Sequence, residues 1–130
     1  MLEKSMIVTN NPSVFEKYAE RRKVEYMEGK TYMEVLEHVR DMLHAGHKLL
    51  THPLSGSVKP NETPYKSILV SLETKETLDR DGILIMEDAI LTVRKFLGNF
   101  PTPNWTERVL DDFRVVDLSL MENTIDKLGH

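Results

Sequence analysis

Short apolar runs alternate with stretches of helical periodicity along the first half of this chain, and this alternation limits the folds open to it. Apolar residues gather at 5–9, 23–27, 48–52 and 67–72, in runs too short for helices. Between the first three runs, apolar residues recur every three or four positions. Strand–helix–strand repeats of this kind are typical of right-handed βαβ units. The sequence therefore predicts an α/β fold, a three-layer sandwich with a mostly parallel sheet of about four strands and helices on both faces.

The predicted helices have recognisable start and stop signals. Asn11, followed by proline, favours a helix start, because Asn accepts from free amides and proline needs no amide hydrogen in the first turn. Thr31 and Glu34 have the spacing of a capping box. Gly46 is a typical helix terminator. The sequence therefore predicts helices over 12–19 and 32–45.

A long polar segment, 53–66, separates the third and fourth apolar runs. Its three prolines oppose both a helix and a central strand, so the direction of the fourth strand stays open. Loops of this length are uncommon inside compact domains and often functional, and we expect this one to pack against the strand ends. A further helix is predicted over 79–98, and the pattern over 105–128 fits either one helix or two.

Composition excludes several classes of function. The 130 residues fit a single domain, 1–130. The chain has no cysteine, which excludes a disulfide framework, a thiolate zinc site, an iron–sulfur cluster and a cysteine nucleophile. No apolar run approaches the roughly 20 residues needed to span a bilayer, and the N-terminus lacks a signal-peptide core. We therefore expect a cytoplasmic protein with no membrane partner.

Charge and histidine spacing narrow the partners further. The formal net charge is −4, and neither half of the chain is basic enough for a nucleic-acid footprint. The histidines lack the spacing of a metal-binding motif, so no metal site is predicted. No cofactor fingerprint appears either, and the oligomeric state stays open.

Polar side chains follow the predicted strands at the edge where ligands bind in open parallel sheets. Two helices begin at this edge, and their free amides and dipoles favour an anion. The predicted ligand is therefore a small phosphate or carboxylate, and the candidate binding residues are Asn10, Asn11, Lys30, His52, Ser55, Ser57 and Lys59. In the alternative interpretation, these residues only cap helices and form turns. No catalytic residue is identified.

Two motifs resemble the GrdX family. They are TNNP at 9–12 and HPLSGSVKPNETPYKS at 52–67, of which the second is long and unusual. Members of this family are associated with the glycine, sarcosine and betaine reductase systems of amino-acid-fermenting bacteria. The resemblance implies a metabolic setting and a single GrdX-like domain, but it transfers no catalytic assignment. Because reductase chemistry uses selenol and thiol groups, a chain without cysteine is not itself a redox subunit.

Three classes of function stay open. The first is an accessory module that binds a small anionic metabolite in amino-acid metabolism, which a polar pocket at the strand ends would favour. The second is an interaction or assembly factor for a reductase component, which an exposed apolar patch around Trp105 would favour. The third is an unrecognised enzyme, which a base with a shifted pKa beside a nucleophile would favour. Of the three, the two non-enzymatic classes are favoured over an enzyme.

Overall fold

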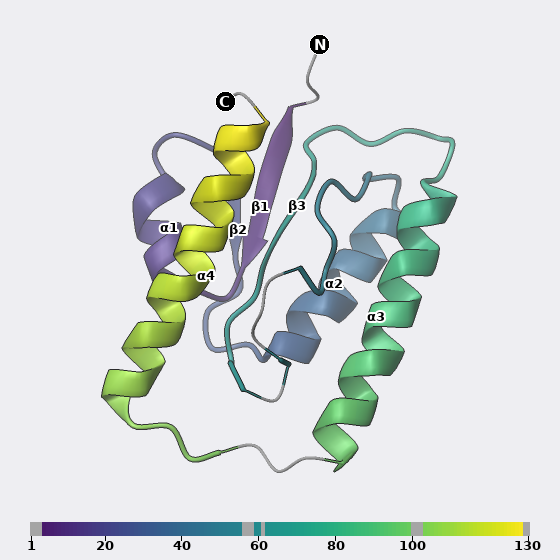
Figure 1. Ribbon diagram of the computed structural model, residues 1–130. Coiled ribbons are helices and arrows are strands. Elements are labelled where there is room, and N and C mark those ends of the chain that lie inside the picture. Colours follow the sequence, from purple (N-terminus) through teal and green to yellow (C-terminus); the bar gives the residue numbers. More distant parts are fainter. Residues whose placement is uncertain (1–3, 56–58, 61, 100–102, 129–130) are drawn as a thin grey trace.

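The computed structural model describes residues 4–55, 59–60, 62–99 and 103–128. Within these residues the chain forms three strands and four helices (Figure 1). In chain order they are β1 (Ser5–Thr9), α1 (Pro12–Tyr18), β2 (Val24–Tyr26), α2 (Tyr32–His44), β3 (Ser67–Ser71), α3 (Arg80–Asn99) and α4 (Glu107–Lys127).

The sheet is small and mixed. Its order is β2-β1-β3, so the first strand is central. β1 pairs with β2 in parallel and with β3 antiparallel, with Ile7 opposite both Val24 and Leu69. The prediction of a four-stranded, mostly parallel three-layer sandwich was therefore wrong, although the chain remains of the α/β class. The segment before β3 contains no helix among its described residues, and a helical crossover is the usual way to place two strands in parallel.

The predicted strand at 48–52 is reduced to a single bridge, Leu49 to Val70. Main-chain hydrogen bonds from the Leu50 amide and to the Lys48 carbonyl join this segment to β3, and side chains satisfy two further amides. The amide of Leu49 donates to Asp79 Oδ2 over 2.9 Å, and the amide of Lys48 donates to Ser71 Oγ over 2.7 Å. Because side chains satisfy these main-chain groups, the segment needs no continuous strand ladder.

The helix signals act as the sequence predicts. Asn11 caps α1, and Thr31 and Glu34 form the capping box of α2. After α2, Gly46 adopts φ +112°, and a β-carbon there would lie 2.5 Å from the carbonyl oxygen of Lys75. Glycine is therefore required at this turn for both its conformation and its lack of a side chain. Over 107–127 the chain forms one helix.

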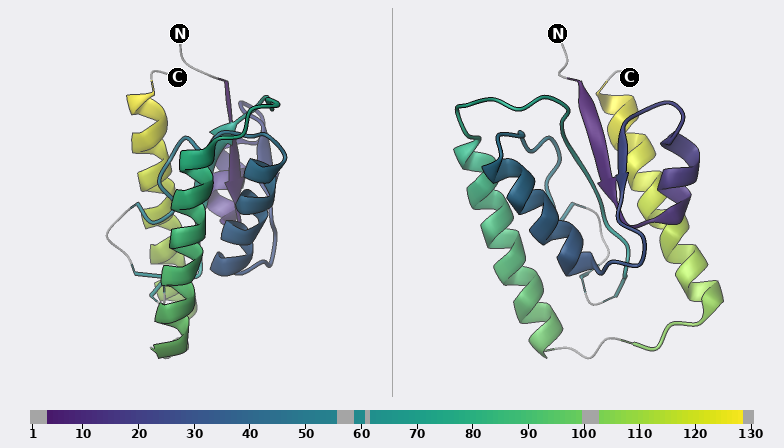
Figure 2. Two further views of the ribbon diagram at one scale, coloured as in Figure 1. Left: turned by 90° about the vertical axis from the view of Figure 1, so that its right-hand side faces the viewer. Right: turned by 180° about the vertical axis from the view of Figure 1, so that it is seen from behind.

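Helices pack on the two faces of the sheet through separate apolar clusters. Met6 and Val8 of β1 belong to the cluster that contains residues of α2 and α3, whereas Ile7 belongs to the cluster that contains residues of α1 and α4. This alternation is the period of two expected of a strand. Figure 2 shows α2 and α4 on opposite sides of β1. Because both faces of β1 are covered, all five of its residues are buried.

Two leucines provide a matched test of this packing. Leu43 of α2 is fully buried, whereas Leu91 of α3 is 61% exposed. We expect Leu43→Ala to lower the free energy of unfolding by about 2–5 kcal/mol, because it leaves a cavity in the core. The control Leu91→Ala should change it by less than about 0.5 kcal/mol. Urea unfolding followed by circular dichroism measures both, and equal effects would contradict the assigned core.

Candidate functional site

The end of β1 and the start of β3 lie side by side, because these strands are antiparallel. Thr9 pairs with Ser67 in the register, and the hydroxyl oxygens of these residues are 2.6 Å apart. The helix α4 crosses this edge and places Asp117 beside Ser67. Lys66 immediately precedes the strand, so a cationic and an anionic side chain both come to the edge of the sheet.

Lys66 is a buried lysine with few partners. The residue is only 6% exposed. Its Nζ donates to the carbonyl oxygen of Ser55 over 3.1 Å and lies 5.9 Å from the centre of the Tyr32 ring. No described carboxylate lies within 4 Å of it. Burial disfavours the charged form and lowers the pKa of Lys66 to about 8, and the charge of Asp117 opposes this shift only in part.

Asp117 is held by two donors. Its Oδ2 accepts from Asn11 Nδ2 over 3.0 Å and from Ser67 Oγ over 2.7 Å. Both hydrogen bonds and the charge of Lys66 favour the carboxylate form. Burial outweighs them and raises the pKa of Asp117 above its ordinary value. The carboxyl group is thus firmly placed, and its ionised form carries a desolvation cost.

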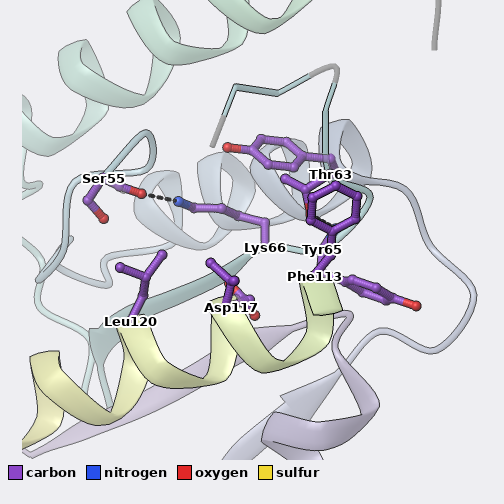
Figure 3. Close-up of a pocket in the computed structure, with 9 residues that line it drawn as sticks. Ser55, Thr63, Tyr65, Lys66, Phe113, Asp117 and Leu120 are labelled. Atoms are coloured by element: carbon purple, nitrogen blue, oxygen red, sulfur yellow. Dashed lines mark hydrogen bonds between the residues drawn. The ribbon is translucent and has the colours of Figure 1, made fainter. Parts of the chain in front are cut away.

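A small cavity lies beside these two groups. It has a volume of about 20 Å³, and its lining residues are Tyr32, Ser55, Thr63, Tyr65, Lys66, Phe113, Val116, Asp117 and Leu120. Figure 3 shows the Lys66 side chain reaching toward Ser55, with Asp117 and Leu120 of α4 on one side. A second cavity of about 10 Å³ shares Ser55, Lys66, Asp117 and Leu120.

The cavities are small, but they open toward solvent. Volumes of this size hold about one water molecule, or one functional group of a ligand. Val116 and Leu120 on the lining are 40% and 37% exposed. A ligand would therefore place one polar group beside Lys66 and leave the rest along α4.

Asn10 and Asn11 were both predicted to bind a ligand. In the structure they connect the segments that surround this site. Asn10 Nδ2 donates to the carbonyl oxygens of Lys30 and Pro64, and its Oδ1 accepts from the amide of Lys66. Asn11 caps α1 and donates to Asp117 and to the carbonyl oxygen of Arg114. The amide groups of both side chains thus make hydrogen bonds within the protein, and their role here is structural.

The other predicted residues are less close together. Ser55 lines both cavities and supplies its carbonyl oxygen to Lys66. His52 is exposed, and its Nδ1 accepts from the amide of Leu54. Lys30 and Lys59 are exposed and line neither cavity. Ser57 lies outside the described residues.

Sequence reasoning missed the two charged residues of the site. Lys66 directly precedes an apolar run, and Asp117 stands among valines and leucines on α4. A charged residue within an apolar pattern is a usable signal for a buried charge, because such residues are almost never buried without a compensating partner. The proximity of Lys66 and Asp117 could not be predicted from the sequence, because it depends on where α4 crosses the sheet.

Metal-ligand clusters, membrane-spanning helices and the surroundings of Trp105 bear on the other candidate functions. No group of three or more histidine, aspartate or glutamate side chains among the described residues is placed to hold a metal ion. None of the described helices combines the length and the apolar character needed to cross a bilayer. Trp105 is half-buried and packs edge-on against Phe113, with ring centres 6.0 Å apart.

The buried charge predicts an unusual pH dependence of stability. Between about pH 8 and pH 10.4 the unfolded chain holds the Lys66 proton and the folded chain does not. The contribution of Lys66 to the free energy of unfolding therefore rises with pH over this range. Below pH 8 the charged lysine opposes folding. We expect Lys66→Met to raise the free energy of unfolding at pH 7 by about 1–3 kcal/mol.

The advantage of this variant should shrink as the pH rises from 8 toward 10.4. Denaturant titrations at several pH values measure the difference from the parent protein. Lys95→Met, at an exposed position of α3, is the control and should show no such trend. A destabilised Lys66→Met protein at pH 7 would mean that the ammonium is stabilised in the fold.

The comparisons with known proteins give one result. A family model described as GrdX-like protein matches residues 6–126, nearly the whole chain. No curated protein and no solved structure matches it. The matched region includes β1 from Met6 on, the other two strands, the Asn10–Asn11 pair, Lys66 and Asp117. Because the match covers far more than half of the sequence, the chain belongs to the GrdX-like family.

Proposed function

We propose that this protein is an accessory protein of the glycine, sarcosine and betaine reductase systems that holds a small carboxylate at Lys66. Membership of the GrdX-like family supports the metabolic setting. The observation that carries the binding role is the buried ammonium group of Lys66, which has one hydrogen bond to a described residue. An ammonium group can donate three hydrogen bonds, so two N–H groups are left for a ligand.

A carboxylate suits this site better than a phosphate. The cavity beside Lys66 has room for one functional group, and Lys66 is the one cationic residue among its described lining residues. Phosphate sites usually combine several main-chain amides with charged side chains. The start of α1 does not serve this purpose, because the Asn11 side chain already accepts from the Ser13 amide.

The neighbouring acid makes binding depend on pH. A bound carboxylate would repel an ionised Asp117, which already has a raised pKa. Binding should therefore favour proton uptake by Asp117, and affinity should increase as the pH falls below neutral. This dependence holds until the ligand itself becomes protonated.

A second candidate function is docking to a reductase component. Three apolar residues of α4, Val109, Val116 and Leu120, are between 36% and 40% exposed, and Val115 is 54% exposed. Exposed apolar residues that gather on one helix can mark an interaction surface. This role makes no use of Lys66, so variants of that residue separate the two candidates.

Thermal melting in the presence of acetate, glycine, sarcosine or betaine tests the carboxylate site. A ligand that binds only the native state raises the melting temperature. We expect at least one of these compounds to stabilise the parent protein, with a larger shift at pH 6 than at pH 8. In Lys66→Met the affinity should fall about ten-fold or more, because a charge-assisted hydrogen bond is lost.

Two comparisons make this test specific. Lys95→Met should bind as tightly as the parent, and inorganic phosphate should give a smaller shift than the carboxylates. A shift that persists unchanged in Lys66→Met would reject Lys66 as the binding group. If no carboxylate shifts the melting temperature while a reductase component binds the protein through α4, the docking role is the correct one.

A further inference from the structure

We infer that Lys66 captures a small carbonyl compound, an aldehyde or an oxo acid, as a reversible imine. The inference rests on the proposed ligand site and specifies the reactive group that enters it. Three features support it: the amine is shielded without a paired carboxylate, it is held at its main chain, and its surroundings favour the neutral form.

The amine is shielded without being neutralised. Lys66 is 6% exposed, and its Nζ has one hydrogen bond to a described residue, at the carbonyl oxygen of Ser55. A structural lysine that carries its charge inside a protein is normally paired with a carboxylate. Here Asp117 Oδ2 instead accepts hydrogen bonds from Asn11 Nδ2 and Ser67 Oγ. The amine is therefore left with room to react.

The lysine is also held in place at its main chain. Its amide donates to Asn10 Oδ1 over 2.9 Å, and the next residue begins β3. The Tyr32 ring lies beside the ammonium group. A reacting group on a rigid support is more effective than one on a free loop, because less freedom is lost when the ligand binds. The cavity of about 20 Å³ adjoins this amine and has space for a carbonyl group.

The surroundings favour the reactive form of the amine. With a pKa of about 8, about a tenth of the Lys66 side chains are neutral at pH 7, against fewer than about one in a thousand for an exposed lysine. Only a neutral amine is a nucleophile, and desolvation is a known way to activate lysine. This preference sets Lys66 apart from the exposed lysines of the chain.

The reaction balances without an added oxidant or reductant. The neutral nitrogen attacks the carbonyl carbon, so a carbon–nitrogen bond forms. The two protons of the amine pass to the carbonyl oxygen, which leaves as one water molecule. The product is an imine, and the reverse reaction with water releases the compound. A protonated imine keeps the positive charge near Asp117, as in the parent pair.

Reductive trapping tests the imine directly. The full-length protein is incubated at pH 7 with glyoxylate and sodium cyanoborohydride, which reduces an imine to a stable secondary amine. Peptide mapping by mass spectrometry then locates the added mass. At low glyoxylate concentration we expect Lys66 to carry at least ten-fold more label than Lys95 or any other exposed lysine. Omitting the reductant should leave no stable label.

The outcomes separate this inference from the proposed function. If Lys66 is labelled no more than exposed lysines, the imine is rejected, even where acetate still stabilises the parent protein. If Lys66 is labelled but no carboxylate shifts the melting temperature, the imine stands and the carboxylate site is rejected. Lys66→Arg, which keeps the charge but forms no stable imine, should lose the dominant label while remaining folded by circular dichroism. Dominant labelling at another residue of Lys66→Arg that equals the parent level would also overturn the inference.

Discussion

Hydrogen bonds from two buried asparagine side chains hold this fold together at the end of its central strand. Asn10 connects the turn after β2, through Lys30, with the segment before β3, through Pro64 and Lys66. Asn11 connects the start of α1 with α4. Buried amide groups are costly unless all their partners are present, so these contacts are mutually dependent. The position of Lys66 beside Asp117 follows from this network.

Local signals predicted much of the fold. The strand predicted at 5–9, the cap at Asn11 and the capping box at Thr31 all depend on neighbouring residues, and all are present. The strand predicted at 67–72 is present over Ser67–Ser71. The pairing of strands could not be predicted in this way. The direction of β3 depends on the path of the segment before it. Two amides of the segment at 48–52 are satisfied by the side chains of Ser71 and Asp79, which lie later in the sequence.

In the candidate site too, local features could be predicted from the sequence and long-range contacts could not. Sequence reasoning placed the candidate residues at the edge of the sheet, and of these Asn10, Asn11 and Ser55 lie beside Lys66 or Asp117. It assigned the cationic role to lysines at loop positions, whereas Lys30 and Lys59 are exposed and Lys66 is buried. The burial of Lys66 arises from contacts with Tyr32 and with residues of α4, more than 30 positions away in each case. No local pattern contains that information.

The central position of β1 also affects how the chain folds as it is synthesised. The first strand made needs β3, about 60 residues later, to cover its second edge, and it needs α4 to cover one face. Long-range pairings of this kind form slowly, because the intervening chain must be ordered first. Until α4 leaves the ribosome, Val14 and Tyr18 of α1 are the buried helix residues available to cover Ile7 and Leu69, so this face of the sheet is only partly covered. The helix that supplies Asp117 is thus also the one that ends the exposure of the nascent sheet.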